Sequence, residues 1–295
     1  MEVIKEVVFL SGKGGVGKTS ILGGIYSLMD GEKGVVDCDV DAANLFLILG
    51  CKVKEEKPFY GSKKAEIRKA KCQECGLCKD VCEFGAINEL FVVDPIICEG
   101  CGSCFVFCPH SAVSFIEERA GTIYIGETKK GDLFLYAELF PGEESSGKLV
   151  QTLREEARRR AKERGLSLIL MDGSPGIGCP VISSVAGVDL VVALCEPQTS
   201  SVHDLLRLLE LTEHFRIRTA LLINKSDVNP SLSARLKKIA EEKGLPLLGE
   251  IPYDPLIIEA QREGKTIVEY SRDSVCSKAL ERVYERFSMI LEELR

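Results

Sequence analysis

The feature that most restricts the fold of this chain is a glycine-rich loop close to its first residue. The segment Gly12–Thr19 reads GKGGVGKT and fits the pattern G-x-x-x-x-G-K-[ST] of a phosphate-binding loop. An apolar run at Glu6–Leu10 predicts a strand before it, and Thr19–Asp30 predicts a helix after it. With a further strand predicted at Gly34–Asp37, the order strand, loop, helix, strand predicts an α/β fold with a mostly parallel sheet.

The residues of this loop suit the binding of a nucleotide phosphate chain. Glycines let successive backbone N–H groups turn towards phosphate oxygens at a helix N-terminus. We expect Lys18 to reach the β- and γ-phosphates and the Thr19 hydroxyl to bind Mg²⁺. The predicted phosphate-binding glycines are Gly12, Gly14, Gly15 and Gly17.

A second motif lies further along the chain, where eight of the thirteen cysteines crowd into 37 positions. The run Cys72, Cys75, Cys78 and Cys82 recurs 26 residues later as Cys98, Cys101, Cys104 and Cys108. The match extends to Gly76 and Gly102 and to Ala86 and Ala112. The repeat predicts two copies of one small unit, related by a pseudo-twofold axis.

The spacing Cys-x₂-Cys-x₂-Cys-x₃-Cys, given twice, is the pattern of bacterial proteins with two [4Fe–4S] clusters. In that pattern the fourth cysteine of each run binds the other cluster. The predicted ligand sets are therefore Cys72, Cys75, Cys78 and Cys108 for one cluster, and Cys98, Cys101, Cys104 and Cys82 for the other. Zinc is the alternative, but four-cysteine zinc sites rarely string their ligands so tightly and repeat the string.

The domain organisation follows from these two motifs. We predict a nucleotide-binding domain at 1–60 and 120–295, interrupted at 61–119 by a small α+β ferredoxin-like domain. Residues 52–71 hold eight Lys or Arg against three Glu, with Pro58 and Gly61, and this predicts a linker. Later strands are predicted at 122–125, 133–139, 166–171, 190–194, 219–223 and 246–248, and helices at 149–164, 202–214, 232–243 and 277–295.

Composition narrows the class of protein. The formal net charge is −7 and the pI is about 5.3, which argue against nucleic acid as the main partner. No apolar run reaches the roughly 18 residues of a membrane span, and no signal peptide precedes the first strand. Clustered cysteines in a long chain of this kind favour a metal site in a reducing compartment, so we expect a cytoplasmic protein.

An additional lysine in the loop introduces a family resemblance. GKGGVGKT, with Lys13, resembles the deviant Walker A motif of the superfamily that includes MinD, ParA and the nitrogenase iron protein. The resemblance implies an ATPase in which Lys13 crosses a dimer interface and contacts the partner's nucleotide. A surface lysine without a role is the alternative. The family resemblance also implies ATP and Mg²⁺ as ligands, with Ser20 in the nucleotide site beside Thr19.

Other segments resemble the remaining motifs of this superfamily. Val36–Asp41 resembles switch I, which implies that Asp39 orients the attacking water and that Asp37 acts close to Mg²⁺. Met171–Gly176 resembles Walker B and switch II, which implies that Asp172 holds Mg²⁺ through water. Lys13, Lys18, Asp39 and Asp172 are thus the candidate catalytic residues.

Two further segments, 224–227 and 251–254, resemble the base-binding segments, which places Asn224, Pro252 and Asp254 around the adenine. Cys179 follows Asp172 by seven residues, as a cluster-binding cysteine does in the nitrogenase iron protein. The second cysteine of that protein has no counterpart here. A ligand role and an interface role for Cys179 both stay open.

Three functional hypotheses follow. The first is an ATPase that gates electron transfer through two [4Fe–4S] clusters to a redox partner. The second is an ATPase that assembles or delivers clusters to an apo-protein acceptor, and the third is a positioning ATPase, which gives no reason for two clusters. In each case we expect a homodimer or a heterodimer with a related subunit.

Overall fold

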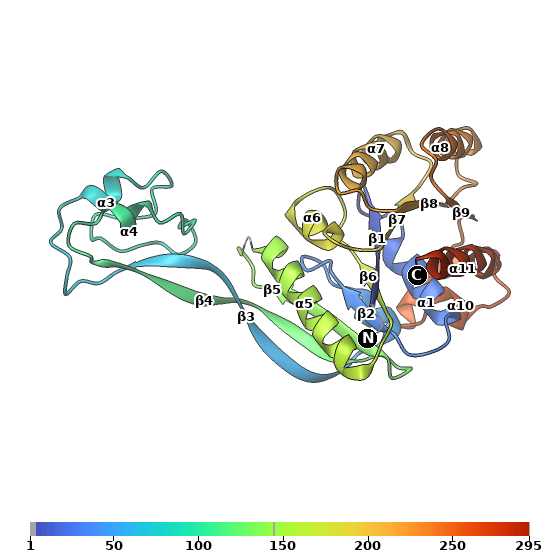
Figure 1. The fold of residues 1–295 in the computed structure, drawn as a ribbon, viewed down its shortest axis with the longest axis horizontal. Helices are drawn as coiled ribbons and strands as arrows, with labels where there is room; N and C mark the ends of the chain where they lie inside the picture. The colour runs from blue at the N-terminus through green and yellow to red at the C-terminus, as the bar shows by residue number, and fades with distance from the viewer. Residues whose placement is uncertain (1–3, 144, 295) are drawn as a thin grey trace. The chain divides into compact units, whose positions relative to one another are not determined.

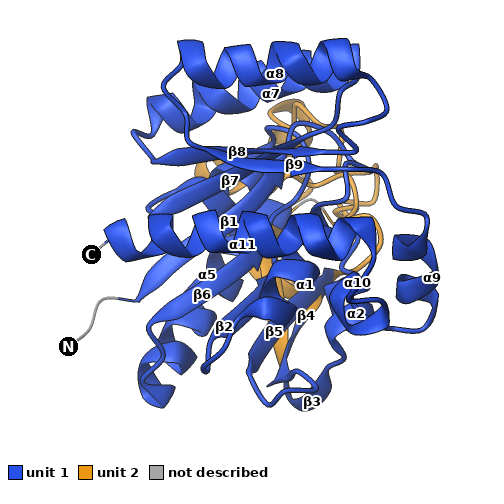
Figure 2. Cartoon of the chain, turned by 90° about the vertical axis from the view of Figure 1, so that its right-hand side faces the viewer, with its two compact units in different colours: residues 1–56, 123–138, 146–295 blue, residues 57–122, 139–145 orange. Residues whose placement is uncertain are grey.

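The computed structural model describes residues 4–143 and 145–294, which divide into two compact units (Figure 2). Unit 1 takes the chain up to Glu56, then Ile123–Glu138, then the chain from Ser146 onwards. Unit 2 takes Lys57–Thr122 and Leu139–Ser145. The chain therefore leaves unit 1 and returns to it twice.

The strands form one sheet, whose order among the described residues is β3-β4-β5-β2-β6-β1-β7-β8-β9. Every pair from β5 to β9 in this order is parallel. The strands are β1 (Lys5–Ser11), β2 (Gly34–Asp37), β3 (Lys52–Ile67), β4 (Val113–Glu127), β5 (Leu133–Leu139), β6 (Leu168–Asp172), β7 (Leu190–Cys195), β8 (Thr219–Asn224) and β9 (Leu247–Ile251).

Helices cover both faces of the sheet in unit 1 (Figure 1), with α1 and α11 on one face and α5, α6 and α7 on the other. The helices are α1 (Lys18–Leu28), α2 (Leu45–Leu49), α3 (Leu77–Asp80), α4 (Ser103–Phe107), α5 (Ser146–Arg164), α6 (Cys179–Val185), α7 (Thr199–His214), α8 (Pro230–Glu242), α9 (Leu256–Arg262), α10 (Ile267–Tyr270) and α11 (Val275–Glu293). In the part of the chain that the structure describes, none of them is long and apolar enough to cross a membrane.

The central strands are apolar without a break because both of their faces are covered. In β1, Val7 to Leu10 have no exposed surface. The core on one face joins β1 to α11, where the rings of Phe9 and Phe287 lie 5.9 Å apart. The last helix therefore packs on the core.

Parallel strands present their carboxyl ends at one edge of a sheet, and ligands of such sheets bind there. The phosphate-binding loop follows β1, Asp37 ends β2, Asp172 ends β6, and Asn224 ends β8. The strand predictions in unit 1 are correct to within two residues at either end for β1, β2, β5, β6, β7 and β8. The parallel α/β fold is confirmed.

One prediction was wrong. Residues 52–67 are not a linker but the 16-residue strand β3, and β4 runs for 15 residues where only Thr122–Ile125 was expected. Exposed ribbon strands bury few side chains, so charged residues do not exclude them, and charge is common on the edge strand of a sheet. Pro58 is also compatible with a strand here, because β3 is the edge strand and one of its sides forms no ladder hydrogen bonds.

The two copies of the cysteine repeat in unit 2 have the same local structure. Gly76 and Gly102 have φ of 85° and 87° and start α3 and α4, which pack against each other. These left-handed positions favour glycine. The small core of the unit contains Cys78, Cys98 and Cys104.

Candidate functional site

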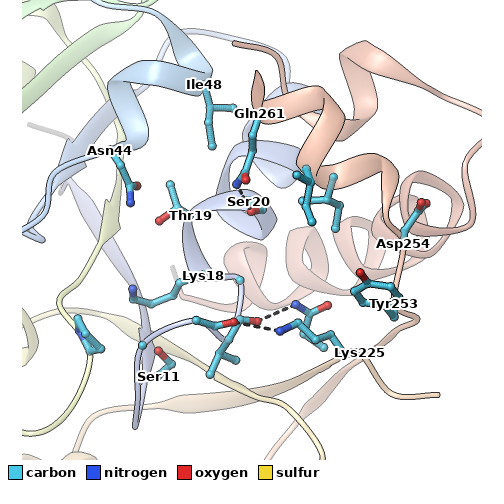
Figure 3. A pocket seen from close by; sticks show the side chains of 18 of the residues that line it. Ser11, Lys18, Thr19, Ser20, Asn44, Ile48, Lys225, Tyr253, Asp254 and Gln261 are labelled. Carbon is cyan, nitrogen blue, oxygen red and sulfur yellow. Dashed lines mark hydrogen bonds between the residues drawn. The ribbon is translucent and has the colours of Figure 1, made fainter. Parts of the chain in front are cut away.

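A pocket of about 540 Å³ opens at the carboxyl ends of the strands of unit 1 (Figure 3). Its walls come from the phosphate-binding loop, α2, α9 and the loops after β2, β6, β8 and β9. Of the residues predicted to bind nucleotide, the pocket is lined by Gly14, Gly15, Gly17, Lys18, Thr19, Ser20, Asp39, Asn224, Pro252 and Asp254. Gly12 and Lys13 are not among the lining residues.

The loop is fixed from the end of β8. Asn224 donates from Nδ2 to the carbonyl of Val16 at 2.7 Å, and Lys225 donates from Nζ to the carbonyl of Gly15 at 3.0 Å. Gly17 has φ 94°, and a Cβ there would lie 2.6 Å from Asn224 Nδ2, so only glycine fits. The Oδ1 atom of Asn224 is buried and has no hydrogen-bond partner among the described residues.

Asp172 is the most constrained acid of the pocket region. Its Oδ2 accepts a hydrogen bond of 2.5 Å from the Thr19 hydroxyl. Its Oδ1 is buried and has no hydrogen-bond partner in the described part of the chain, and Lys18 Nζ lies 3.8 Å from it. Burial raises the pKa of Asp172, and Lys18 and Thr19 oppose this shift. A carboxylate oxygen without a hydrogen bond, beside the Thr19 hydroxyl, suits a hydrated divalent cation.

Asp37 and Asp39 differ in position. Asp37 has no exposed surface, and its carboxylate accepts from the N–H groups of Asp39, Asn44 and Leu45. It therefore shapes the loop after β2, while Asp39 lies in the pocket wall. Burial, followed by the charge of Asp172, raises the pKa of Asp37 to about 7.

Lys13 lies against its own chain. Its Nζ donates to Gln198 Oε1 at 2.7 Å and to Ser200 Oγ at 3.3 Å, and it pairs with Glu196 at 3.1 Å. Glu196 also pairs with Lys225 at 2.8 Å. Sequence reasoning missed these partners because they follow β7, far from the loop in the chain, and only the fold brings them together.

The residues predicted to bind the base, Asn224, Pro252 and Asp254, line the pocket. Asp254 lines the pocket, but its two oxygens accept from the N–H groups of Leu256 and Cys276. It therefore fixes the start of α9 and α11. The lining residues that were not predicted include Tyr253, which is 48% exposed, and Gln261, which donates to Ser20 at 2.7 Å.

Unit 2 contains two hollows lined by cysteines. One is lined by Cys72, Cys75, Cys78 and Cys108. The other is lined by Cys82, Cys98, Cys101 and Cys104. Each hollow thus collects three cysteines of one run and the fourth cysteine of the other run. This is the exchange that the spacing predicts.

Backbone N–H groups point at sulfur in equivalent places of the two copies. Ala86 N–H donates to Cys82 Sγ at 3.4 Å, and Ala112 N–H donates to Cys108 Sγ at 3.3 Å. Burial raises the pKa of Cys104, as do the neighbouring thiols of its own hollow. N–H groups aimed at sulfur stabilise thiolate charge, which a cluster ligand carries.

In residues 4–143 and 145–294, no three His, Cys, Asp or Glu side chains converge as the ligands of a single metal ion do. The cysteines instead surround hollows. Four thiols line each hollow, beside Glu99 in one and His110 in the other, and thiols are the donors that iron–sulfur clusters take.

Cys179 is exposed and starts α6, directly after the segment 173–178 that follows Asp172. It lies next to the first turn of α5, where a Cβ on Gly147 would come within 3.1 Å of Cys179 Cβ. It is not among the cysteines of either hollow. Three other cysteines outside the runs, Cys38, Cys195 and Cys276, are buried.

Comparison with known proteins agrees with this geometry. Residues 7–267 match the family described as the CobQ/CobB/MinD/ParA nucleotide binding domain. An uncharacterised protein of Methanocaldococcus jannaschii is 39% identical over 229 residues, which cover 77% of this chain and 80% of that protein. A second uncharacterised protein of that organism is 23% identical, over 92% of this chain and 94% of the relative.

Solved structures show the same fold at lower identity. MinD of Pyrococcus horikoshii, complexed with Mg-ADP, superposes with a TM-score of 0.61 at 17% identity, over 99% of each chain. Together with the match over residues 7–267, this establishes that the chain belongs to the CobQ/CobB/MinD/ParA family of nucleotide-binding proteins.

Proposed function

We propose that this chain binds and hydrolyses ATP, and that it passes electrons through two [4Fe–4S] clusters to a partner protein. The observation that carries the proposal is the composition of the two hollows, each with three cysteines of one run and the fourth of the other. Two-cluster ferredoxins hold their clusters by this exchange. The same chain contains a P-loop pocket of about 540 Å³.

Two buried atoms without partners favour Mg·ATP as the ligand. Asp172 Oδ1 is available to a water of hydrated Mg²⁺, next to the hydroxyl of Thr19. Asn224 Oδ1 is an amide oxygen and accepts hydrogen bonds, and its Nδ2 atom is engaged by Val16. The exocyclic amine of adenine can donate to such an acceptor, and the choice of ATP over GTP rests on the resemblance to the MinD superfamily.

Dimerisation requires Lys13 to exchange partners. In the single chain Lys13 is held by Glu196, Gln198 and Ser200. The resemblance to the MinD superfamily implies that Lys13 contacts the nucleotide of a facing subunit. The triphosphate of that nucleotide carries a larger negative charge than Glu196. The facing subunit is a second copy or a related chain, since one organism carries two relatives of this protein.

The chain provides a direct connection from the nucleotide to unit 2. The segment 173–178 follows Asp172 and leads into Cys179, which packs against Gly147 in the first turn of α5. Ser145, which belongs to unit 2, directly precedes α5 in the chain, and within unit 2 its Oγ accepts from the N–H of Ser62 at 3.1 Å. A shift of the segment 173–178 on ATP binding would therefore be passed along bonded and packed residues.

Electron transfer is favoured over cluster delivery by the burial of the ligands. Cys78, Cys98 and Cys104 are part of the small core of unit 2, together with Ile87 and Val113. Releasing a cluster would expose this core and leave its thiolates without a partner. A retained cluster, which gains and loses electrons, fits this arrangement better than a cargo.

The test is chemical analysis of the anaerobically purified chain, with Cys104→Ser and, as a matched control outside the runs, Cys51→Ser. We expect about eight iron and eight sulfide per wild-type chain, with a Mössbauer spectrum of cubane clusters, and ATP hydrolysis that depends on Mg²⁺. Cys104→Ser should lose iron while Cys51→Ser keeps it. Zinc in place of iron, or equal iron in the two variants, would contradict the proposal.

A further inference from the structure

The two copies of the cysteine repeat differ in what they expose. In the first copy, α3 carries Lys79 and Asp80 after Cys78, and Lys79 pairs with Glu89. At the equivalent positions of the second copy, α4 carries Phe105 and Val106, followed by Phe107. These three side chains are 51%, 74% and 57% exposed. At these equivalent positions the first copy is therefore charged, and the second presents an apolar face.

The size of this face indicates a transient partner. Aromatic side chains offer about 150–250 Å² each, so the exposed parts of the three residues amount to roughly 300 Å². A stable interface takes about 800 Å² from each partner, while weak redox encounters are smaller. An apolar patch of this size on a small unit is also in the range that marks functional surfaces.

The position of the face indicates what the partner does. The three residues lie in the chain between Cys104, which belongs to one hollow, and Cys108, which belongs to the other. They share a short covalent route to both ligand sets with residues 79–81 of the first copy, which lie between Cys78 and Cys82 and include the charged Lys79 and Asp80. The face carries no charged side chain, so a complementary partner surface is apolar as well.

We propose that Phe105, Val106 and Phe107 form the surface on which a one-electron carrier protein docks, a proposal that rests on the electron-transfer function above. In the docked pair one electron leaves the reduced chain, which is oxidised by one electron, and enters the flavin or iron–sulfur centre of the carrier, which is reduced by one electron. No bond forms or breaks in this chain.

The test uses the reduced, cluster-loaded full chain with two acceptors: oxidised flavodoxin, which must dock, and benzyl viologen, which need not. The variant Val106→Lys places a charge on the face, and Leu90→Lys places the same charge on a residue of similar exposure, 75%, in the same unit. Stopped-flow absorbance gives the transfer rates, and biolayer interferometry gives the binding of flavodoxin to the immobilised chain.

We expect Val106→Lys to lower the flavodoxin transfer rate by about tenfold and to weaken binding by a similar factor. Viologen reduction, iron content and thermal stability should stay unchanged, and Leu90→Lys should behave as wild type. The wild-type transfer rate should vary little with salt concentration, because salt screens charges and the proposed docking contacts are apolar. Phe107→Ser should reproduce the loss without adding a charge.

An unchanged flavodoxin rate in Val106→Lys, an equal loss in Leu90→Lys, or transfer to viologen without any transfer to flavodoxin would overturn the docking surface and leave the electron-transfer function standing. A wild-type chain that reduces neither acceptor would instead overturn the proposed function itself. The two failures are therefore distinguishable in one set of measurements.

Discussion

Replacing Asp172 by asparagine separates the cost of a buried charge from its use in binding Mg²⁺. Removing one partner of a buried ion pair usually costs about 3–5 kcal/mol. Here the pair with Lys18 is long, at 3.8 Å, and Oδ1 has no hydrogen-bond partner among the described residues. Asp37 repels the same carboxylate, and Lys18 keeps Asp39 as a neighbouring counter-charge.

These terms oppose each other in the nucleotide-free chain. Losing the long ion pair destabilises, whereas removing a poorly solvated charge and its repulsion with Asp37 stabilises. We therefore expect the free energy of unfolding of nucleotide-free Asp172→Asn to lie within about 1 kcal/mol of wild type. Asn at this position still accepts the hydrogen bond from Thr19, so the loop keeps that contact.

The bound state should differ much more. A ligand at a thousand times its Kd stabilises a protein by about 4 kcal/mol, or about 10 °C in Tm at 2–4 °C per kcal/mol. Wild type should show this gain with Mg·ADP and a smaller gain with ADP alone. In Asp172→Asn the part that depends on Mg²⁺ should disappear.

Calorimetry with and without Mg²⁺ and ADP measures both quantities. Asp132→Asn is the matched control, because Asp132 is a buried carboxylate whose partners, Tyr26 and Lys33, are in place. That variant should lose stability without nucleotide and keep the full Mg²⁺ response. A loss of 3–5 kcal/mol in nucleotide-free Asp172→Asn, or a retained Mg²⁺ response, would refute the reasoning.

Four further predictions follow from contacts in unit 1. Glu6→Gln should lower the free energy of unfolding by about 3–5 kcal/mol, measured by urea denaturation, because Arg154 stays buried without its charge partner; a loss below about 1 kcal/mol would contradict this. Lys13→Ala should bind ATP normally but fail to form the ATP-dependent dimer in light scattering, and a dimer that persists would exclude the role in trans. Gly147→Val should crowd the start of α6, keep ATP binding and iron, and weaken the effect of nucleotide on the cluster potentials; an unaltered effect would count against this connection. Because burial raises the pKa of Asp37 to about 7, the nucleotide-free chain should lose stability as the pH rises from about 4 towards 7, and Asp37→Asn should remove this slope.

Much of the fold could be predicted because buried parallel strands leave a simple pattern. The runs ending at Leu10, Asp37 and Cys195 are apolar without interruption, and each ends where the chain turns at the ligand-binding edge. The cysteine spacing was equally informative, because a ligand set fixes which residues must meet. Both patterns follow from local sequence.

The remaining features depend on contacts that local sequence does not contain. The exposed ribbon of β3 and β4 lacks a buried face over much of its length, so its alternation is hidden among charges. The partners of Lys13 and the contact of Lys225 with Gly15 join segments about 185 and 210 residues apart. The side-chain roles of Asp37 and Asp254 as backbone acceptors likewise appear only once the loops are placed.

We propose that nucleotide binding and cluster potential are coupled in this single chain, and the decisive measurement is an anaerobic redox titration followed by EPR with and without MgATP. Coupling predicts that MgATP shifts the potential of at least one cluster by about 60 mV, a tenfold change in a one-electron equilibrium, and that MgADP shifts it less. Identical titration curves with and without MgATP, in a chain that carries both clusters and binds ATP, would contradict the claim.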